Sequence, residues 1–182
     1  MPGWLNSEPT HWQSLWEAQY GYERVQQHEW DQPLRGDWLT QLEEAVLSLA
    51  ADQQALLAAH SLGCHLVAAW AAISRHTHRV AGALLVAPPD VGQADFPAAL
   101  HSWCQLVLAP LPFAATCVLS DNDPFGRLDA GQRLSKAWGA DCVVLPGAGH
   151  INGDSGLGVW PGGHEMLLKL KQSAPETAGN TA

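Results

Sequence analysis

A serine between a short apolar run and a helix-like run places the strongest constraint on the fold. Residues 55–59 have the length and apolar character of a buried strand, and residues 66–73 have the pattern of a helix. Ser61 lies between these runs, two positions from Ala59 and from Gly63. A sharp turn needs small residues there, because its backbone is crowded and strained. This arrangement is typical of a nucleophile elbow, which lifts a serine hydroxyl above the end of a sheet.

The turn alone does not establish catalysis. The usual elbow pattern is Gly-x-Ser-x-Gly, and Ala59 stands at the first glycine. A serine at this position can also do no more than cap the following helix. The functional interpretation of Ser61 therefore depends on partners elsewhere in the chain.

Two later loops supply candidate partners. Asp123 follows the apolar run 113–119, and His150 follows the apolar run 142–145. The loops after the strands of an open α/β sheet gather at one edge, so Ser61, Asp123 and His150 can meet there. Their order along the chain, serine then aspartate then histidine, is the order in α/β-hydrolases. The three residues together predict nucleophilic catalysis, and we expect neither a metal nor another cofactor.

The other histidines have structural interpretations. His60 adjoins the serine, but successive residues of a tight elbow point apart, so we expect a packing role. His11 can cap its own helix or shape the entrance of the site, and a structural role is favoured. His65, His76 and His78 lie in no HExxH pattern or paired Cys/His spacing, which argues against a metal site.

Composition narrows the classes of partner. The net charge of −9 at pH 7 argues against nucleic acid and anionic membranes, which attract basic patches. The apolar runs are too short to span a bilayer, and the first residues do not resemble a signal peptide. The four cysteines form no CxxC pair, so we expect a cytoplasmic protein with reduced thiols.

Strand-like and helix-like segments alternate along the chain. This alternation predicts one α/β domain over residues 1–172, with a mostly parallel sheet and right-handed crossovers. Residues 173–182 are small and polar and are expected to form a disordered tail. Besides the elbow strand, strands are expected at residues 23–30, 80–87, 113–119 and 142–145. Helices are expected at residues 11–20 with Thr10 as the cap, 37–51, 66–73, 98–104, 128–138 and 164–171.

Seven motifs in order along the chain carry a family resemblance. They are Pro2-Gly3-Trp4, His11-Trp12-Gln13, Trp30-Asp31-Gln32-Pro33, Ala59-His60-Ser61-Leu62-Gly63, Ala83-Leu84-Leu85-Val86-Ala87-Pro88, Ser120-Asp121-Asn122-Asp123-Pro124, and Gly149-His150-Ile151-Asn152 with Ser155-Gly156 and Trp160-Pro161. In these motifs the chain resembles the small serine hydrolases related to retinoblastoma-binding protein 9 and the bacterial YdeN-like proteins. The resemblance implies a three-layer α/β-hydrolase-like fold and cleavage of a small ester or amide-like bond by Ser61, Asp123 and His150.

Two other carboxylates compete with Asp123. Asp121 lies in the same loop, where it can instead close an Asx turn, and Asp90 also follows an apolar run. Pro124 follows Asp123 as in the family motif, which favours Asp123.

Residues around the triad have expected supporting roles. The backbone N–H groups of Leu62 and Trp4 are expected to form the oxyanion hole. Trp4 and Trp160 flank the predicted site loops and are expected to bind the substrate. The alternative function is a non-catalytic protein-binding module that keeps the fold, since the family name records a protein partner.

The chain departs from the family pattern at its start. Relatives have an apolar strand before the Pro-Gly loop, and here only Met1 precedes Pro2. A sheet that lacks an interior strand leaves backbone groups unpaired and a slot along the core. We therefore expect the first family strand to be missing through truncation. About six to eight apolar residues upstream are expected to raise both stability and rate.

Overall fold

The computed structural model describes residues 1–93 and 96–172. The tail expected at residues 173–182 lies outside the described residues. Four parallel strands form one sheet in the order β1-β2-β3-β4. The strands are β1 (Ala55–His60), β2 (Val80–Val86), β3 (Ala114–Ser120) and β4 (Asp141–Leu145). Every residue of β2 is buried, as expected for an apolar strand that is covered on both faces.

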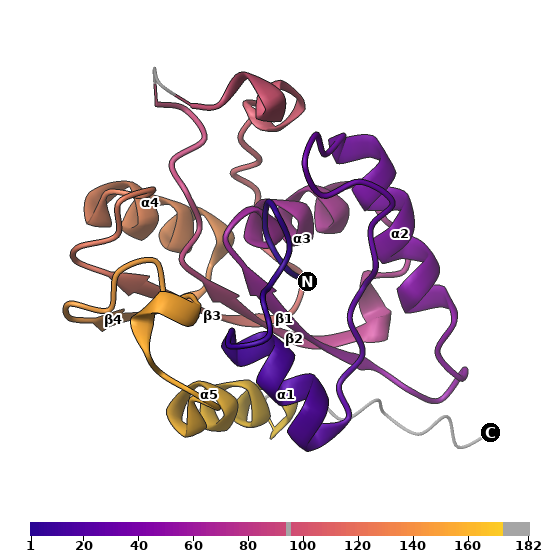
Figure 1. Ribbon diagram of the computed structural model, residues 1–182. Coiled ribbons are helices and arrows are strands. Elements are labelled where there is room, and N and C mark those ends of the chain that lie inside the picture. Colours follow the sequence, from indigo (N-terminus) through magenta and orange to yellow (C-terminus); the bar gives the residue numbers. More distant parts are fainter. Residues whose placement is uncertain (94–95, 173–182) are drawn as a thin grey trace.

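Helices cover both faces of the sheet, which makes the three layers that the resemblance implied (Figure 1). The helices α3 (Leu62–Ile73) and α4 (Leu128–Trp138) pack on one face, and α2 (Arg35–Leu47) packs on α3. On the other face lie α1 (Trp12–Tyr20) and α5 (Pro161–Gln172). Short 3₁₀ turns cover Thr77–Arg79, Ala98–Trp103 and Gly153–Ser155.

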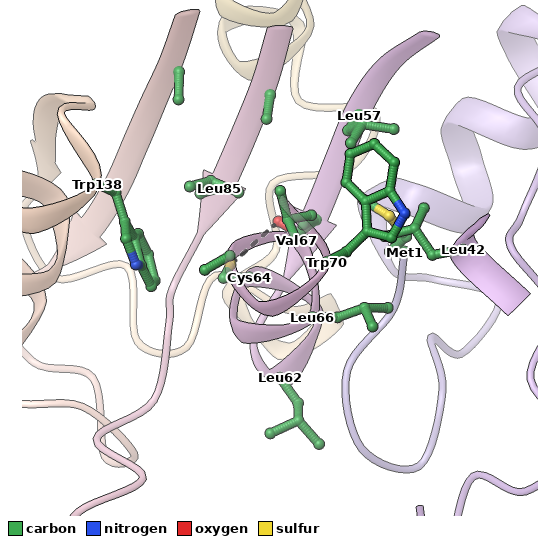
Figure 2. Close-up of a cluster of buried hydrophobic side chains, with 14 of the residues drawn as sticks. Met1, Leu42, Leu57, Leu62, Cys64, Leu66, Val67, Trp70, Leu85 and Trp138 are labelled. Carbon is green, nitrogen blue, oxygen red and sulfur yellow. Dashed lines mark hydrogen bonds between the residues drawn. The ribbon is translucent and has the colours of Figure 1, made fainter. Parts of the chain in front are cut away.

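The two faces of the sheet hold two separate apolar cores. The larger core lies between the sheet and the layer of α2, α3 and α4, with Trp70 and Leu42 facing each other between helices (Figure 2). The smaller core packs Trp12, Trp16 and Trp160 together with aliphatic side chains on the opposite face of the sheet. Because α3 is buried along its first nine residues, the elbow is held by the larger core.

Several helix boundaries differ from those expected. The cap of α1 is His11 rather than Thr10, because the ring Nδ1 of His11 accepts a hydrogen bond from the Gln13 amide. The helix α3 begins at Leu62, directly after the elbow. The helix α5 begins at Pro161, since proline suits the first turn of a helix, where its missing N–H is not needed.

The strand expected at residues 23–30 was wrong. Residues 23–25 are separated from β1 by a cavity of about 370 Å³, so they have no neighbouring strand with which to pair. Within described residues 1–54 no strand is present. Instead, Met1 pairs with the edge of β1 that faces away from β2, donating from its amino group to the Ala58 carbonyl at 2.7 Å and accepting from the His60 amide at 3.0 Å.

Candidate active site

Ser61 occupies a strained turn between β1 and α3. Its φ and ψ of 52° and −123° lie in a region that L-residues seldom adopt. The Ser61 amide donates to the Val86 carbonyl at 2.8 Å, which ties the turn to β2. A Cβ on Gly63 would lie 2.6 Å from the Met1 carbonyl oxygen, and one on Gly3 would lie 2.7 Å from the Ser61 Cβ. The small residues around Ser61 are therefore required by close backbone approaches.

The hydroxyl of Ser61 points to His150 rather than to the backbone of α3. Its Oγ lies 2.9 Å from His150 Nε2, and the hydroxyl makes no capping hydrogen bond to the helix. On the far side of the ring, Nδ1 of His150 lies 2.9 and 3.0 Å from the two carboxylate oxygens of Asp123. The structure thus brings the three predicted residues into one hydrogen-bonded chain.

Side chains in the loop after β3 accept hydrogen bonds from the loop after β4, which carries His150. Asp121 Oδ1 accepts from the Gly147 amide at 2.7 Å, and Asn122 Oδ1 accepts from the Gly149 amide at 2.7 Å. Asp123 is the member of this loop that contacts the imidazole, and its Oδ1 also accepts from the Phe125 amide. Asp90 accepts from the Gly92 amide instead. Of the competing carboxylates, Asp121 therefore supports the histidine loop and Asp90 stabilises its own turn.

The side chains of the histidine and the aspartate of the triad are buried. The side chains of His150 and Asp123 are 9% and 3% exposed. Two further histidines lie behind the site, with the His60 ring 4.8 Å from that of His150 and 4.6 Å from that of His11. Burial, together with the charge of His150, lowers the pKa of His60 well below its ordinary value. The same two causes lower the pKa of His11 to about 3. Both rings therefore stay neutral near pH 7.

A cavity of about 560 Å³ opens beside Ser61. Leu62 and Trp4, the two residues expected to supply the oxyanion donors, both border this cavity. Among the described residues that line it, Glu8 is the one acidic side chain. The walls are otherwise mainly apolar and aromatic, formed by Trp4, Leu5, Leu62, Pro89, Phe96, Pro97, Leu100 and Phe125.

The structure places one of the two tryptophans expected to bind substrate, Trp4, at the cavity, and the other, Trp160, away from it. Trp4 borders the cavity and donates from its indole N–H to the Asp31 carbonyl at 2.7 Å. Trp160 does not line the cavity; it is 6% exposed and packs against Trp12 and Trp16 in the smaller core. Sequence reasoning missed Phe96 and Leu100, because nothing in the irregular segment after β2 marks which of its residues turn inward.

Neither a metal cluster nor a membrane-spanning helix is found in the described part of the chain. No group of three or more histidine, cysteine, aspartate or glutamate side chains is arranged to hold a metal ion there. No helix within residues 1–93 and 96–172 is long and apolar enough to cross a bilayer. Cys142 is exposed, since it lies in the outermost strand β4.

Comparisons with known proteins bear on the family and the fold. A model of the serine hydrolase family matches residues 1–169. A protein described as a YdeN-like hydrolase from Pectobacterium atrosepticum is 26% identical, with a TM-score of 0.80 over 96% of this chain and 90% of that chain. The ydeN gene product of B. subtilis is 18% identical, with a TM-score of 0.69 over 94% of this chain and 96% of that chain.

A more distant structure shares the fold. The esterase RhEst1 from Rhodococcus sp. is 12% identical, with a TM-score of 0.65 over 96% of this chain and 90% of that chain. No curated protein matches the chain in sequence. The matching structures show that the parallel sheet and its flanking helices form an α/β-hydrolase fold.

Proposed function

The chain belongs to the serine hydrolase family, and from this premise we propose that it cleaves a small ester or amide-like substrate through Ser61, His150 and Asp123. The observation that carries the proposal is the continuous chain of hydrogen bonds from the Ser61 hydroxyl through the His150 ring to the Asp123 carboxylate. A serine hydroxyl is a weak nucleophile until a neighbouring base removes its proton, and His150 Nε2 is within reach to do so.

In the first half of the reaction, Ser61 Oγ attacks the substrate carbonyl while His150 takes the hydroxyl proton. Asp123 holds the ring with its hydrogen on Nδ1 and stabilises the positive charge that forms. The carbonyl oxygen becomes an oxyanion, which the backbone N–H groups of Leu62 and Trp4 stabilise. His150 then gives its proton to the leaving group, and an acyl-enzyme remains.

In the second half, water attacks the acyl-enzyme. His150 removes a proton from the water and returns it to Ser61 Oγ, which releases the acid product and restores the enzyme. The apolar walls of the cavity favour an uncharged acyl group, because apolar surface gains free energy when it leaves water. An anionic group beside Glu8 would meet a like charge, so neutral substrates suit the site best.

A covalent probe tests the proposal. A fluorophosphonate is expected to label the wild-type protein at Ser61, and Ser61→Ala is expected to abolish both labelling and hydrolysis of short-chain acyl esters. Ser48→Ala is the matched control, because Ser48 is exposed at the end of α2. Labelling that persists in Ser61→Ala contradicts the assignment. A folded wild-type protein that neither reacts nor turns over any ester favours the non-catalytic binding module.

A further inference from the structure

Two neighbouring carbonyl groups in the loop of His150 accept hydrogen bonds from buried side chains. His60 Nε2 lies 2.8 Å from the carbonyl oxygen of His150, and Trp12 Nε1 lies 2.9 Å from that of Ile151. A carbonyl oxygen can only accept, so the hydrogen of the neutral His60 ring is on Nε2. The two donors are 5% and 1% exposed, and they come from β1 and α1. Two separate elements therefore hold consecutive peptide groups of one loop.

The loop needs such support because its backbone is strained. Gly149 has a φ of 57° and Ile151 has a φ of 49°, so His150 lies between two residues in left-handed conformations. For a β-branched residue such as isoleucine this conformation is especially unfavourable. Strain of this kind persists only where the surrounding structure fixes the backbone in several ways.

We propose that His60 and Trp12 are positioning residues, whose hydrogen bonds hold the strained turn so that the His150 ring stays between Ser61 and Asp123. The proposal rests on the function proposed above. It assigns a task to His60, for which the sequence favoured only packing. Neither residue exchanges a proton with substrate in this scheme, since His60 contacts the backbone of His150 and Trp12 contacts that of Ile151.

A neutral histidine suits this position. The His60 ring meets the His150 ring edge to face, and His150 becomes positively charged during catalysis. A second positive charge at this distance would oppose that charge. Because burial keeps His60 neutral, it donates its hydrogen bond without repelling the imidazolium.

The motif His11-Trp12-Gln13 explains how Trp12 is held in place. His11 caps α1 by accepting from the Gln13 amide, and its ring packs against that of His60. The Gln13 side chain donates from Nε2 to the carbonyl oxygens of Met1 and Ala58, at 3.0 and 3.1 Å. The start of α1 is thus fixed to β1 at the same place from which His60 reaches the loop.

A pair of variants at one position tests the proposal. His60→Leu fills the space but removes the donor, whereas His60→Gln keeps an N–H at a similar reach. We expect His60→Leu to lower kcat on a short-chain ester and the rate of fluorophosphonate labelling by about 10- to 100-fold, with little change in KM. His60→Gln is expected to recover most of both rates. Equal rates for His60→Leu and wild type, or equal losses in both variants, overturn the proposal.

A second pair serves if the leucine variant does not fold. Trp12→Phe removes the donor to Ile151 but keeps an aromatic ring. Its control is Trp38→Phe, because Trp38 is equally buried and donates to the Glu29 carbonyl in the other core. The expected result is a loss of kcat at least 10-fold greater in Trp12→Phe than in Trp38→Phe. Similar losses in these two variants contradict the proposed role of Trp12.

Hydrogen exchange separates this proposal from the proposed function. If wild type is not labelled at Ser61, the proposed function fails, but exchange at the amides of residues 149–152 still reports on the loop. We expect these amides to exchange faster in His60→Leu than in His60→Gln. The comparison is made at conditions where the two variants have equal thermal stability. Unchanged exchange overturns the positioning role, whereas faster exchange in an unreactive protein supports the loop contact and rejects only the chemistry.

Discussion

At the scale of single residues, the Asp123 carboxylate makes three hydrogen bonds that fix its orientation toward His150. Both of its oxygens face His150 Nδ1, and Oδ1 also accepts from the Phe125 amide. The neighbouring carboxylate of Asp121 instead accepts from the Gly147 amide. Two acids in one loop therefore have separable tasks, one on the imidazole and one on the backbone behind it.

The two acids give a residue-scale prediction. Asp123→Asn is expected to lower kcat by about 10⁴-fold, because an amide no longer selects the tautomer with hydrogen on Nδ1. Asp121→Asn keeps an oxygen that can accept from Gly147, so its effect is expected to stay within about 10-fold. Steady-state hydrolysis of a short-chain ester measures both variants. A larger loss in Asp121→Asn than in Asp123→Asn would show that the acid is misassigned.

The sequence predicted those candidate site residues whose chemistry depends on residue type and chain order. Ser61, Asp123 and His150 were predictable because each follows a strand and the three have the order of the family. The support from His60 and Trp12 was not, because a hydrogen bond to a backbone carbonyl leaves no pattern in the sequence. Trp160 was assigned to the pocket from its place in the chain, but a positive φ of 40° and two tryptophan neighbours direct it into the core.

At the scale of elements, β1 lies at one edge of the sheet with a cavity beside it. Of the described backbone, Met1 pairs with its outer edge, and the cavity beside it is lined by Leu57, Val46 and Val25 among others. The same cavity explains why the strand expected at residues 23–30 is absent. Alternating apolar and polar residues do not form a strand unless a neighbouring strand accepts and donates their backbone hydrogen bonds. The strands β2, β3 and β4 were predicted to within about two residues because each is a continuous apolar run between turns.

This edge gives an element-scale prediction. An added segment of about six alternating Val and Thr residues before Met1 is expected to pair with β1 and to fill the cavity. We expect a rise in Tm of about 5 °C, on the order of 2 kcal/mol in the free energy of unfolding. Thermal unfolding followed by circular dichroism measures it. A Gly/Ser extension of equal length is the control, and an equal shift for both extensions would show that the cavity takes no strand.

At the scale of the whole molecule, burial keeps four basic groups neutral near pH 7. Burial lowers the pKa of the Met1 amino group from 8.0 to about 5, and that of His65 from 6.5 to about 4. Burial also lowers the pKa of His11 to about 3, and that of His60 well below 6.5. Each group therefore binds a proton in the unfolded chain at a pH where the folded chain does not.

The sign of the resulting pH dependence follows from these protons. Below pH 8 the unfolded chain binds a proton at its amino group, and below pH 6.5 it binds up to three more at His11, His60 and His65. The free energy of unfolding rises with pH wherever the unfolded chain holds more protons, by up to about 1.4 kcal/mol per pH unit for each. The stability that these four groups contribute is therefore fully present above pH 8 and is lost as the pH falls through 6.5 toward their folded pKa values, which reach down to about 3.

Urea unfolding between pH 5.5 and 8.5 measures this prediction. From pH 8 to 7 the free energy of unfolding is expected to fall with the slope of roughly one proton, and below pH 6.5 the slope is expected to steepen toward about four. An Nα-acetylated chain should lose the first of these slopes, because its amide does not titrate. His60→Gln should lower the second by about one proton, since glutamine carries no titratable ring. A free energy of unfolding that stays constant or increases as the pH falls from 8 to 6 would mean that these groups are hydrated in the folded protein.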